Sequence, residues 1–224
     1  MFFPIGDANI KHGHKAFFTY LIIAANIAVF AMQFMMPNDL QQRFVMDYGC
    51  IPNELMQFKQ WHTVITSMFL HGGVMHLLGN MLFMWVFADN IEATIGNFKF
   101  LLFYLAGGVV ATLTHVFFNA GSEVPCVGAS GAIAACLGAY LVMFPHSKIK
   151  IFFIIFLTTF NVSAIYFLGF WIVQQFMSGM GSIGVATAGV AYWAHIGGFV
   201  FGVLIGWLIN KEHLGQPVKR WVED

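Results

Sequence analysis

Apolar residues recur along most of this chain in runs of about twenty, the length of helix that crosses a lipid bilayer. Only short polar breaks separate the runs. The pattern predicts an all-α, polytopic membrane protein that forms a single domain over residues 1–224. Six transmembrane helices are expected at residues 16–36, 75–95, 98–118, 130–144, 151–176 and 190–209.

Two stretches depart from this simple pattern. Residues 37–74 mix polar turns with aromatic side chains, which predicts a folded outer loop lying partly in the membrane interface. The run at 130–144 is too short to cross the bilayer by itself. We therefore expect its polar, glycine-containing approach at residues 121–129 to dip below the membrane surface, shielded by protein.

The composition agrees with a membrane location. The chain is 59% hydrophobic and 9% charged, whereas a soluble domain is roughly one-half apolar and one-quarter charged. Its formal net charge is zero, and no dense basic block outside the helices suggests nucleic acid. Membrane lipid is thus the expected surroundings, and nucleic acid is not an expected partner.

The basic residues are distributed unequally between the two sides of the six predicted helices. The outer side carries only Arg43 and Lys59. The side of the termini carries eight basic residues: Lys11, Lys15, Lys99, Lys148, Lys150, Lys211, Lys219 and Arg220. Short loops rich in lysine and arginine stay in the cytoplasm. Both termini are therefore predicted to be cytoplasmic, with residues 37–74 outside.

Acidic residues are missing from the middle of the predicted membrane helices. All ten lie in loops, termini or at the inner end of the second helix, where Asp89 and Glu92 are found. An aspartyl protease, a carboxylate proton relay and a His/Glu zinc site each need acids facing the site. These classes are disfavoured, and no metal or cofactor is expected.

Four polar side chains are predicted to lie at one depth in the outer part of the membrane. His76 and Asn80 are four residues apart and so share one face of the second helix. Ser130 begins the fourth helix, and His195 lies about one turn and a half into the sixth. Three helices would thus converge on one polar site.

Small residues every four positions would let the fourth and sixth helices approach closely. On the sixth helix these are Gly198, Gly202 and Gly206. On the fourth they are Ser130, Ala134 and Gly138. Such stripes can also serve packing alone, but Ser130 and His195 at their outer ends favour a site.

The residue types indicate nucleophilic catalysis by a serine and a histidine. A neutral His195 can take the proton of Ser130 and later return it to a leaving amine. The backbone N–H of Ser130, the Asn80 amide and the His76 ring could stabilise the resulting oxyanion. The alternatives are structural: a lone asparagine often bonds a neighbouring helix, and a lone serine its own backbone.

The three cysteines, Cys50, Cys126 and Cys136, have no metal-type spacing. They are interpreted as packing residues. A disulfide between Cys50 and Cys126 stays open as an alternative, if both loops face an oxidising compartment.

These residues lie in local strings that resemble the rhomboid family of intramembrane serine proteases. The segment 128–132, GASGA, is similar to the nucleophile motif of that family, and 194–202, AHIGGFVFG, to its AHxxGxxxG motif. Further similarities are the HxxxxHxxxN spacing, the ExxxG element and the outer-loop tryptophan, carried by His71, His76 and Asn80, by Glu92 and Gly96, and by Trp61.

Two positions depart from the family pattern. His62 stands where the usual arginine follows the outer-loop tryptophan, which bears on how that loop is anchored. Ala134 stands where many members carry an aromatic that packs on the catalytic histidine. Another ring would have to substitute, or His195 would be held less tightly.

The resemblance implies a six-helix serine endopeptidase that cleaves transmembrane protein substrates in or near the membrane, in a bacterial inner membrane. Ser130 and His195 would be catalytic, with His76 and Asn80 at the oxyanion. The fifth helix and the loop 178–189 would form a gate and cap, with Phe170 and Trp171 as gate residues. Motif residues in supporting roles are His71, Gly128, Gly131, Gly198, Gly202 and Glu92.

Two other functions are weighed against proteolysis. A non-catalytic rhomboid-like protein would bind membrane clients, but such members lack the serine or the histidine. A channel or transporter could use His76, Asn80 and His195 along a path. The missing intramembrane acids and the lack of inverted repeats argue against it.

Overall fold

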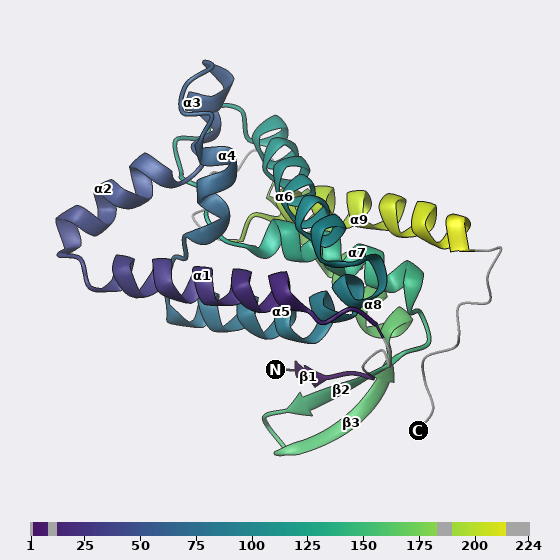
Figure 1. Cartoon of the computed structure of the whole chain (residues 1–224). Coiled ribbons are helices and arrows are strands. Elements are labelled where there is room, and N and C mark those ends of the chain that lie inside the picture. The colour runs from purple at the N-terminus through teal and green to yellow at the C-terminus, as the bar shows by residue number, and fades with distance from the viewer. Residues whose placement is uncertain (1, 9–12, 183–189, 214–224) are drawn as a thin grey trace.

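The computed structural model describes residues 2–8, 13–182 and 190–213, and most of them are helical (Figure 1). Six apolar helices carry the fold. They are α1 (Phe17–Phe34), α5 (Val74–Ile95), α6 (Asn97–Phe118), α7 (Ser130–Met143), α8 (Ala164–Gly181) and α9 (Tyr192–His213).

The predicted six-helix membrane fold is confirmed, although the helices are not equal in length or polarity. By length and composition, α1, α5, α6 and α9 are long and apolar enough to cross a membrane. The 14-residue α7 is shorter, as the sequence indicated. Helix α8 is mostly apolar but contains two adjacent glutamines, Gln174 and Gln175.

The first part of the predicted span 151–176 is wrong, because residues 148–163 form a β-hairpin. Strands β2 (Lys148–Phe153) and β3 (Thr158–Ser163) pair antiparallel, and β1 (Phe2–Gly6) adds to the free edge of β2. Along β2 exposed Lys148 and Lys150 alternate with buried Ile149 and Ile151. That period of two, with β-branched and aromatic residues, is typical of a strand, whereas summed hydrophobicity ignores period.

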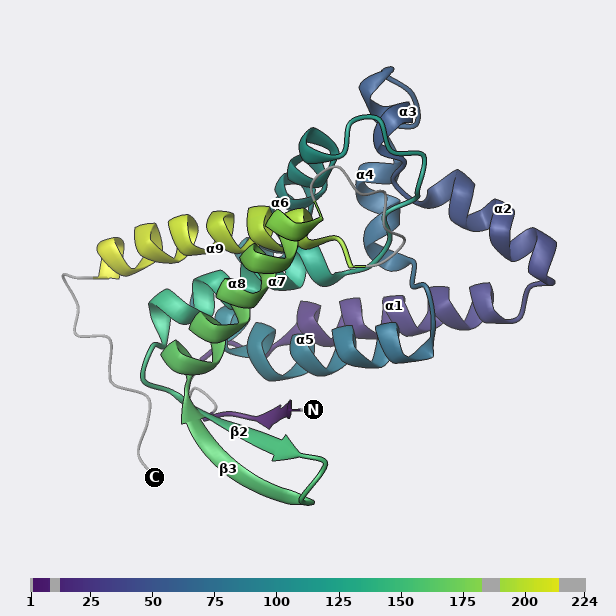
Figure 2. The ribbon, with the colours of Figure 1, turned by 180° about the vertical axis from the view of Figure 1, so that it is seen from behind.

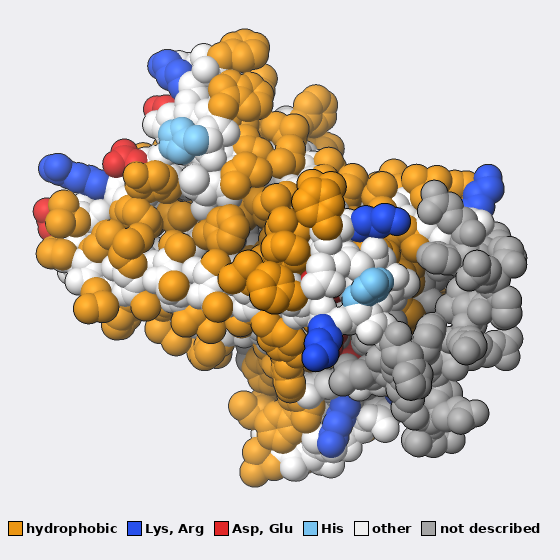
Figure 3. Space-filling view, in the orientation of Figure 1, with side chains coloured by type: hydrophobic (Ala, Val, Ile, Leu, Met, Phe, Trp, Pro, Cys, Tyr) orange, Lys and Arg blue, Asp and Glu red, His pale blue; other side chains and the backbone are white. Residues whose placement is uncertain are grey.

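Large apolar side chains cover much of the outer surface. Figure 3 shows them over the helices, with charged side chains at the upper left and on the right-hand part of this face. Exposed examples are Leu102 of α6, Phe170 of α8 and Leu204 of α9, each more than half exposed. A soluble monomer rarely exposes contiguous apolar patches this large. The protein is therefore an integral membrane protein whose outer helical faces contact lipid.

Helix α7 is the centre of the bundle. It packs against α5, α6, α8 and α9, and residues 131–140 are all buried. Figure 2 shows α8 crossing in front of α7 and α9. The protein surroundings explain how so short a helix can lie within a membrane domain, because its backbone ends need not meet lipid.

The outer loop 37–74 is folded, as predicted. It contains α2 (Asn38–Tyr48), α3 (Pro52–Met56), α4 (Thr63–Thr66) and the 3₁₀ helix η1 (Ser67–Phe69). The His62 ring nitrogen Nε2 lies 3.0 Å from the backbone carbonyl of Asp47, and the Thr66 hydroxyl donates to the carbonyl of Tyr48. His62 thus ties α4 to α2. This contact gives the loop an anchor at the position where the family pattern has arginine.

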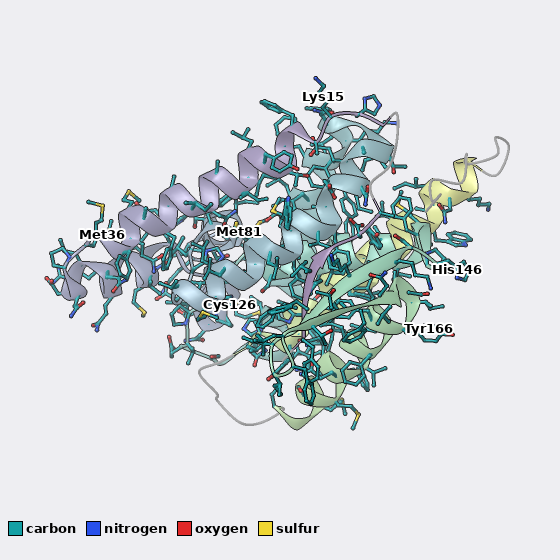
Figure 4. The ribbon with its side chains drawn as sticks, turned by 90° about the horizontal axis from the view of Figure 1, so that it is seen from below. Lys15, Met36, Met81, Cys126, His146 and Tyr166 are labelled. Carbon is teal, nitrogen blue, oxygen red and sulfur yellow. The ribbon has the colours of Figure 1, made fainter. Side chains whose placement is uncertain are left out.

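Segments that follow one another alternate between the two ends of the bundle. In Figure 4 Lys15 and Met36 lie at opposite ends of α1. Cys126, before α7, lies toward the Met36 end, and His146, after α7, toward the Lys15 end. The start of α7 therefore belongs to the same end as the outer loop, which is the arrangement that the six-span pattern predicted.

Buried Glu92 fixes the beginning of α1. Its carboxylate, near the end of α5, accepts hydrogen bonds from the backbone N–H groups of Phe18 and Thr19 at 2.8 and 2.7 Å. The Thr19 hydroxyl donates to it as well, at 2.7 Å. The first N–H groups of a helix have no partner within the helix, and a negative charge there is favourable. Glu92 therefore has a structural role, far from the polar site.

Candidate active site

The backbone before α7 brings Ser130 to the polar face of α5. Gly128 has φ = +126°, a conformation that L side chains rarely adopt. A Cβ at this position would lie 2.9 Å from the His76 ring and 3.5 Å from Nδ2 of Asn80. The Gly128 N–H donates to the Ser67 carbonyl of η1 at 2.9 Å. Only glycine fits between the outer loop and these two side chains, two residues before the serine.

The expected close approach of α7 and α9 is present, but the α7 residues that meet the α9 glycines differ from the predicted ones. A Cβ on Gly198 would lie 2.1 Å from the Gly131 carbonyl oxygen, and one on Gly202 only 1.9 Å from that of Ala135. The α7 residues that meet these glycines are Gly131, Ala135 and Ala139. Of the predicted stripe, Gly138 also packs on α9, because a Cβ on it would lie 2.1 Å from the Phe199 carbonyl oxygen. Backbone touches backbone along this seam.

This seam places the two reactive side chains in hydrogen-bond contact. The Ser130 Oγ and the His195 Nε2 are 2.8 Å apart. Ser130 is half-buried, and His195 is 8% exposed. A base must lie within about 2.6–3.2 Å of the proton that it abstracts, so the geometry suits proton transfer from serine to histidine.

Gln175 of α8 contacts the other nitrogen of the same imidazole, and the sequence analysis did not select it. Its Oε1 lies 2.7 Å from the His195 Nδ1, and its side chain is 5% exposed. An amide oxygen accepts, so the Nδ1 carries the proton and the Nε2 lone pair faces Ser130. A glutamine within an apolar run was the available signal.

Trp171, one turn before Gln175 on α8, packs on the His195 ring. The ring centroids are 5.7 Å apart and the planes are tilted by 33°. Trp171 also packs on Phe199 of α9. It supplies the aromatic contact that Ala134 cannot make. The other predicted gate residue, Phe170, points outward and is 75% exposed.

His76 lies against Gly128, two residues before the serine, and His71 lies next to His76. Their rings are 5.2 Å apart in an edge-to-face arrangement. The fully buried His71 has a pKa lowered to about 4, first by burial and then by neighbouring His76. It is therefore neutral at pH 7. The side chain of Gln33 in α1 accepts from the His71 N–H and donates to its carbonyl, which fixes the segment.

His76 and Asn80 present hydrogen-bond donors near the serine. The Gly72 N–H lies 3.4 Å from the His76 Nδ1, so the His76 Nε2 would carry the proton, on the side that faces Gly128. Asn80 is 7% exposed, and within the described part of the chain no acceptor contacts its Nδ2. Two donors thus lie against the backbone that leads to Ser130.

Two further predictions have mixed outcomes. Cys50 and Cys126 form an isolated antiparallel bridge through their backbones, and both thiols are free. The proposed gate and cap loop 178–189 is described only to residue 182, so residues 183–189 lie outside the described part. The same holds for Lys11, Lys219 and Arg220 of the charge argument.

A polytopic helical membrane protein with a buried, oriented serine–histidine pair is the class that fold and site define. The chain matches the rhomboid domain family over residues 58–212. That match covers more than half of the chain, including α5 to α8, nearly all of α9, and Ser130, His195 and Gln175. The chain belongs to the rhomboid family.

Curated relatives agree with this assignment. Rhomboid protease GluP of Bacillus subtilis (strain 168) is 31% identical over 214 residues, which cover 96% of this chain and 39% of that protein. Rhomboid protein 1, mitochondrial, of Saccharomyces cerevisiae is 29% identical over 218 residues, 92% of this chain and 57% of that protein. Rhomboid-like protein 11, chloroplastic, of Arabidopsis thaliana is 30% identical over 172 residues, 73% and 59% respectively. The chain thus spans well under two thirds of each relative's length.

Proposed function

We propose that this protein is an intramembrane serine endopeptidase in which Ser130 is the nucleophile and His195 the general base. The observation that carries the proposal is the 2.8 Å contact between Ser130 Oγ and His195 Nε2, with the opposite ring nitrogen held by an acceptor. A serine hydroxyl is a poor nucleophile at neutral pH unless an adjacent base removes its proton. The proposal also draws on family membership and on relatives named as proteases.

The first half of the reaction forms an acyl-enzyme. The Ser130 Oγ attacks the substrate carbonyl carbon while its proton passes to the His195 Nε2. The carbonyl oxygen becomes an oxyanion, which would accept hydrogen bonds from the Asn80 amide, the His76 ring and the Ser130 backbone N–H. Collapse breaks the C–N bond, and His195 returns the proton to the leaving amine.

The second half restores the enzyme by the same groups. Water attacks the ester carbon and gives a proton to His195, and the C–O bond to Ser130 then breaks as the serine takes the proton back. No charge needs to enter from outside the site in either half. This suits a buried site, where an unpaired charge is costly.

The substrates proposed are transmembrane proteins, cleaved in or near a spanning segment. A helical peptide bond is shielded and must unwind before attack, so helix-breaking residues near the cut and a small residue before it are expected from the family resemblance. The proposed location is a bacterial inner membrane, with both termini in the cytoplasm, although mitochondrial relatives exist. A client-binding protein without activity, or a channel, is the competing proposal.

The test compares wild-type protein with Ser130→Ala and His195→Ala in detergent or liposomes, on a model transmembrane substrate. Both variants should abolish cleavage, since members of a catalytic unit are not additive. A fluorophosphonate should label the wild type at Ser130 and neither variant. Ser163→Ala, at the start of α8, is the matched control and should cleave normally. Undiminished cleavage by purified Ser130→Ala would overturn the proposal.

A further inference from the structure

The polar contact that α8 makes with His195 has no role in a two-residue mechanism. Gln175 is buried among the apolar helices, and its amide is itself held in one orientation, because its Nε2 donates to the Gln174 Oε1 at 2.9 Å. That bond turns the Gln175 Oε1 toward the His195 Nδ1, 2.7 Å away. Burying a polar side chain in an apolar helix costs free energy unless it is hydrogen-bonded. The presence of Gln175 at this position therefore suggests a function for its contact with His195.

We infer that Gln175 is a positioning residue of the active site, which holds His195 in the Nδ1–H tautomer and keeps its Nε2 free for Ser130. The inference rests on the proposed function. The His195 ring lies between the two side chains: its Nδ1 is 2.7 Å from the Gln175 Oε1, and its Nε2 is 2.8 Å from the Ser130 Oγ. With the other tautomer, the Nε2 would carry a proton and could not accept the serine proton.

An amide in this position suits its surroundings. In soluble serine proteases a buried carboxylate orients the imidazole and also stabilises its positive charge. A charged side chain in a transmembrane helix costs several kcal/mol unless it is paired. A neutral amide supplies the acceptor without that cost, but gives less stabilisation to the imidazolium. Orientation and tautomer are thus the contributions expected from Gln175.

The other neighbours of His195 do not replace this contact. The titratable side chains that face it are His76 of α5 and His115 of α6. Ser130 of α7 takes the Nε2, and Trp171 of α8 covers the ring. Among the described residues the His195 Nδ1 has one hydrogen-bond partner, the Gln175 amide, so removing this amide should change the behaviour of the ring.

The test uses two near-isosteric replacements of Gln175 in the full-length protein. Gln175→Met keeps the volume and removes the acceptor, so kcat should fall about ten- to a hundredfold with KM unchanged, the effect of one hydrogen bond to a group that becomes charged. Gln175→Glu restores the acceptor, so kcat should return. Its carboxylate also favours the imidazolium, so the acid limb of the pH–rate profile should move to higher pH. Val173→Ala, exposed on the same helix, is the control and should leave both quantities unchanged.

The outcomes separate this inference from the proposed function. If cleavage does not depend on Ser130, the proposed function is wrong, and the role of Gln175 in it is wrong as well. If cleavage depends on Ser130 but Gln175→Met has the wild-type kcat, the positioning role is wrong. It is equally wrong if Gln175→Glu shows its acid limb at the wild-type pH, because a purely structural glutamine would not move that limb. Nitrogen-15 NMR of the His195 ring, which reads the tautomer without turnover, should show an Nδ1–H in the wild type and a tautomer mixture in Gln175→Met.

Discussion

Helix α9 packs against α6, α7 and α8, and its contacts with α7 and α8 are built differently. Toward α7 the glycines Gly198 and Gly202 of α9 lie directly against backbone carbonyls. Toward α8 the contact is made by side chains, chiefly Trp171 and Gln175 on His195. Several side chains of α8 also point outward and are exposed, including Phe170 and Met177. The α7–α9 contact leaves no room for an added side chain, whereas the α8–α9 contact depends on a few side chains that can change rotamer.

The difference has a physical origin. Small residues let helix backbones approach, and many weak contacts then add up along the seam. A Cβ placed 1.9 Å from a backbone oxygen cannot be accommodated by rotating a side chain. On α8 the long side chains can change rotamer while the backbone stays in place. The α7–α9 seam is therefore expected to control stability, and the α8 contact to control activity.

The largest expected effect is at the α7–α9 seam. Gly202→Ala places a methyl against the Ala135 carbonyl, so the helices must separate, and we expect a loss of at least about 3 kcal/mol, the upper range of overpacking. Gly169→Ala on α8 meets nothing within 4 Å and should instead stabilise by roughly 0.5–1 kcal/mol, since alanine favours helix. Unfolding of both variants in mixed detergent micelles measures the difference. Equal effects at the two glycines would contradict the comparison.

A smaller effect is expected at the α8 contact. Trp171→Ala removes the ring that packs on His195, an interaction typically worth about 0.5–1.5 kcal/mol, so kcat should fall up to roughly tenfold. Phe170→Ala next to it removes a side chain that is 75% exposed and should leave kcat unchanged. Steady-state cleavage by the two variants is the measurement. A larger effect of Phe170→Ala would instead favour the gate role that the sequence suggested for it.

The smallest expected effect is on stability, at the C-terminal end of α7, where the ionisable side chain of Asp7 contacts the helix. The Asp7 carboxylate accepts hydrogen bonds from Tyr140 of α7 and Asn90 of α5, which ties the N-terminal segment to the bundle. Burial raises the pKa of Asp7 from 3.8 to about 6, although these hydrogen bonds act in the opposite direction. Because the folded pKa is the higher one, the stabilisation is fully present below about pH 4 and is lost as the pH rises through 6.

Asp7→Asn should remove that pH dependence. Its thermal stability should therefore change less between pH 4 and pH 7 than that of the wild type. Asp39→Asn in the outer loop is a control for the general effect of removing one carboxylate. If the Asp7→Asn and wild-type curves run parallel over this range, the carboxylate is not buried as the structure has it.

Much of the helical frame could be predicted because the membrane imposes it. A bilayer demands apolar runs of set length, and five of the six predicted spans lie close to α1, α5, α6, α7 and α9. The sixth prediction was wrong over residues 151–163, where an apolar strand and an apolar helix have the same mean hydropathy. Only the alternation of Lys148, Ile149, Lys150 and Ile151 distinguished the two.

The candidate active site was likewise predictable only in part. Ser130 and His195, with His76 and Asn80 nearby, could be selected from the chain because polar residues are rare in apolar helices and three helix starts shared one depth. Gln175 also stands out as a polar residue in an apolar run, but its contact with His195 and the role of Trp171 could not be predicted. They depend on how α8 is rotated and inclined against α9, and the apolar faces of α8 leave several rotations equally acceptable in lipid.

The sequence by itself determined the membrane location, the helical frame, the candidate nucleophile and base, and the glycines that allow α7 and α9 to touch. These follow from local chemistry: hydrophobic length, rare polar side chains and missing Cβ atoms. Tertiary structure alone decided which residues of α7 meet the α9 glycines, which side chains hold His195, and that β2 pairs with the N-terminal strand β1. Those outcomes depend on distances between segments far apart in the chain, which residue type and spacing do not specify.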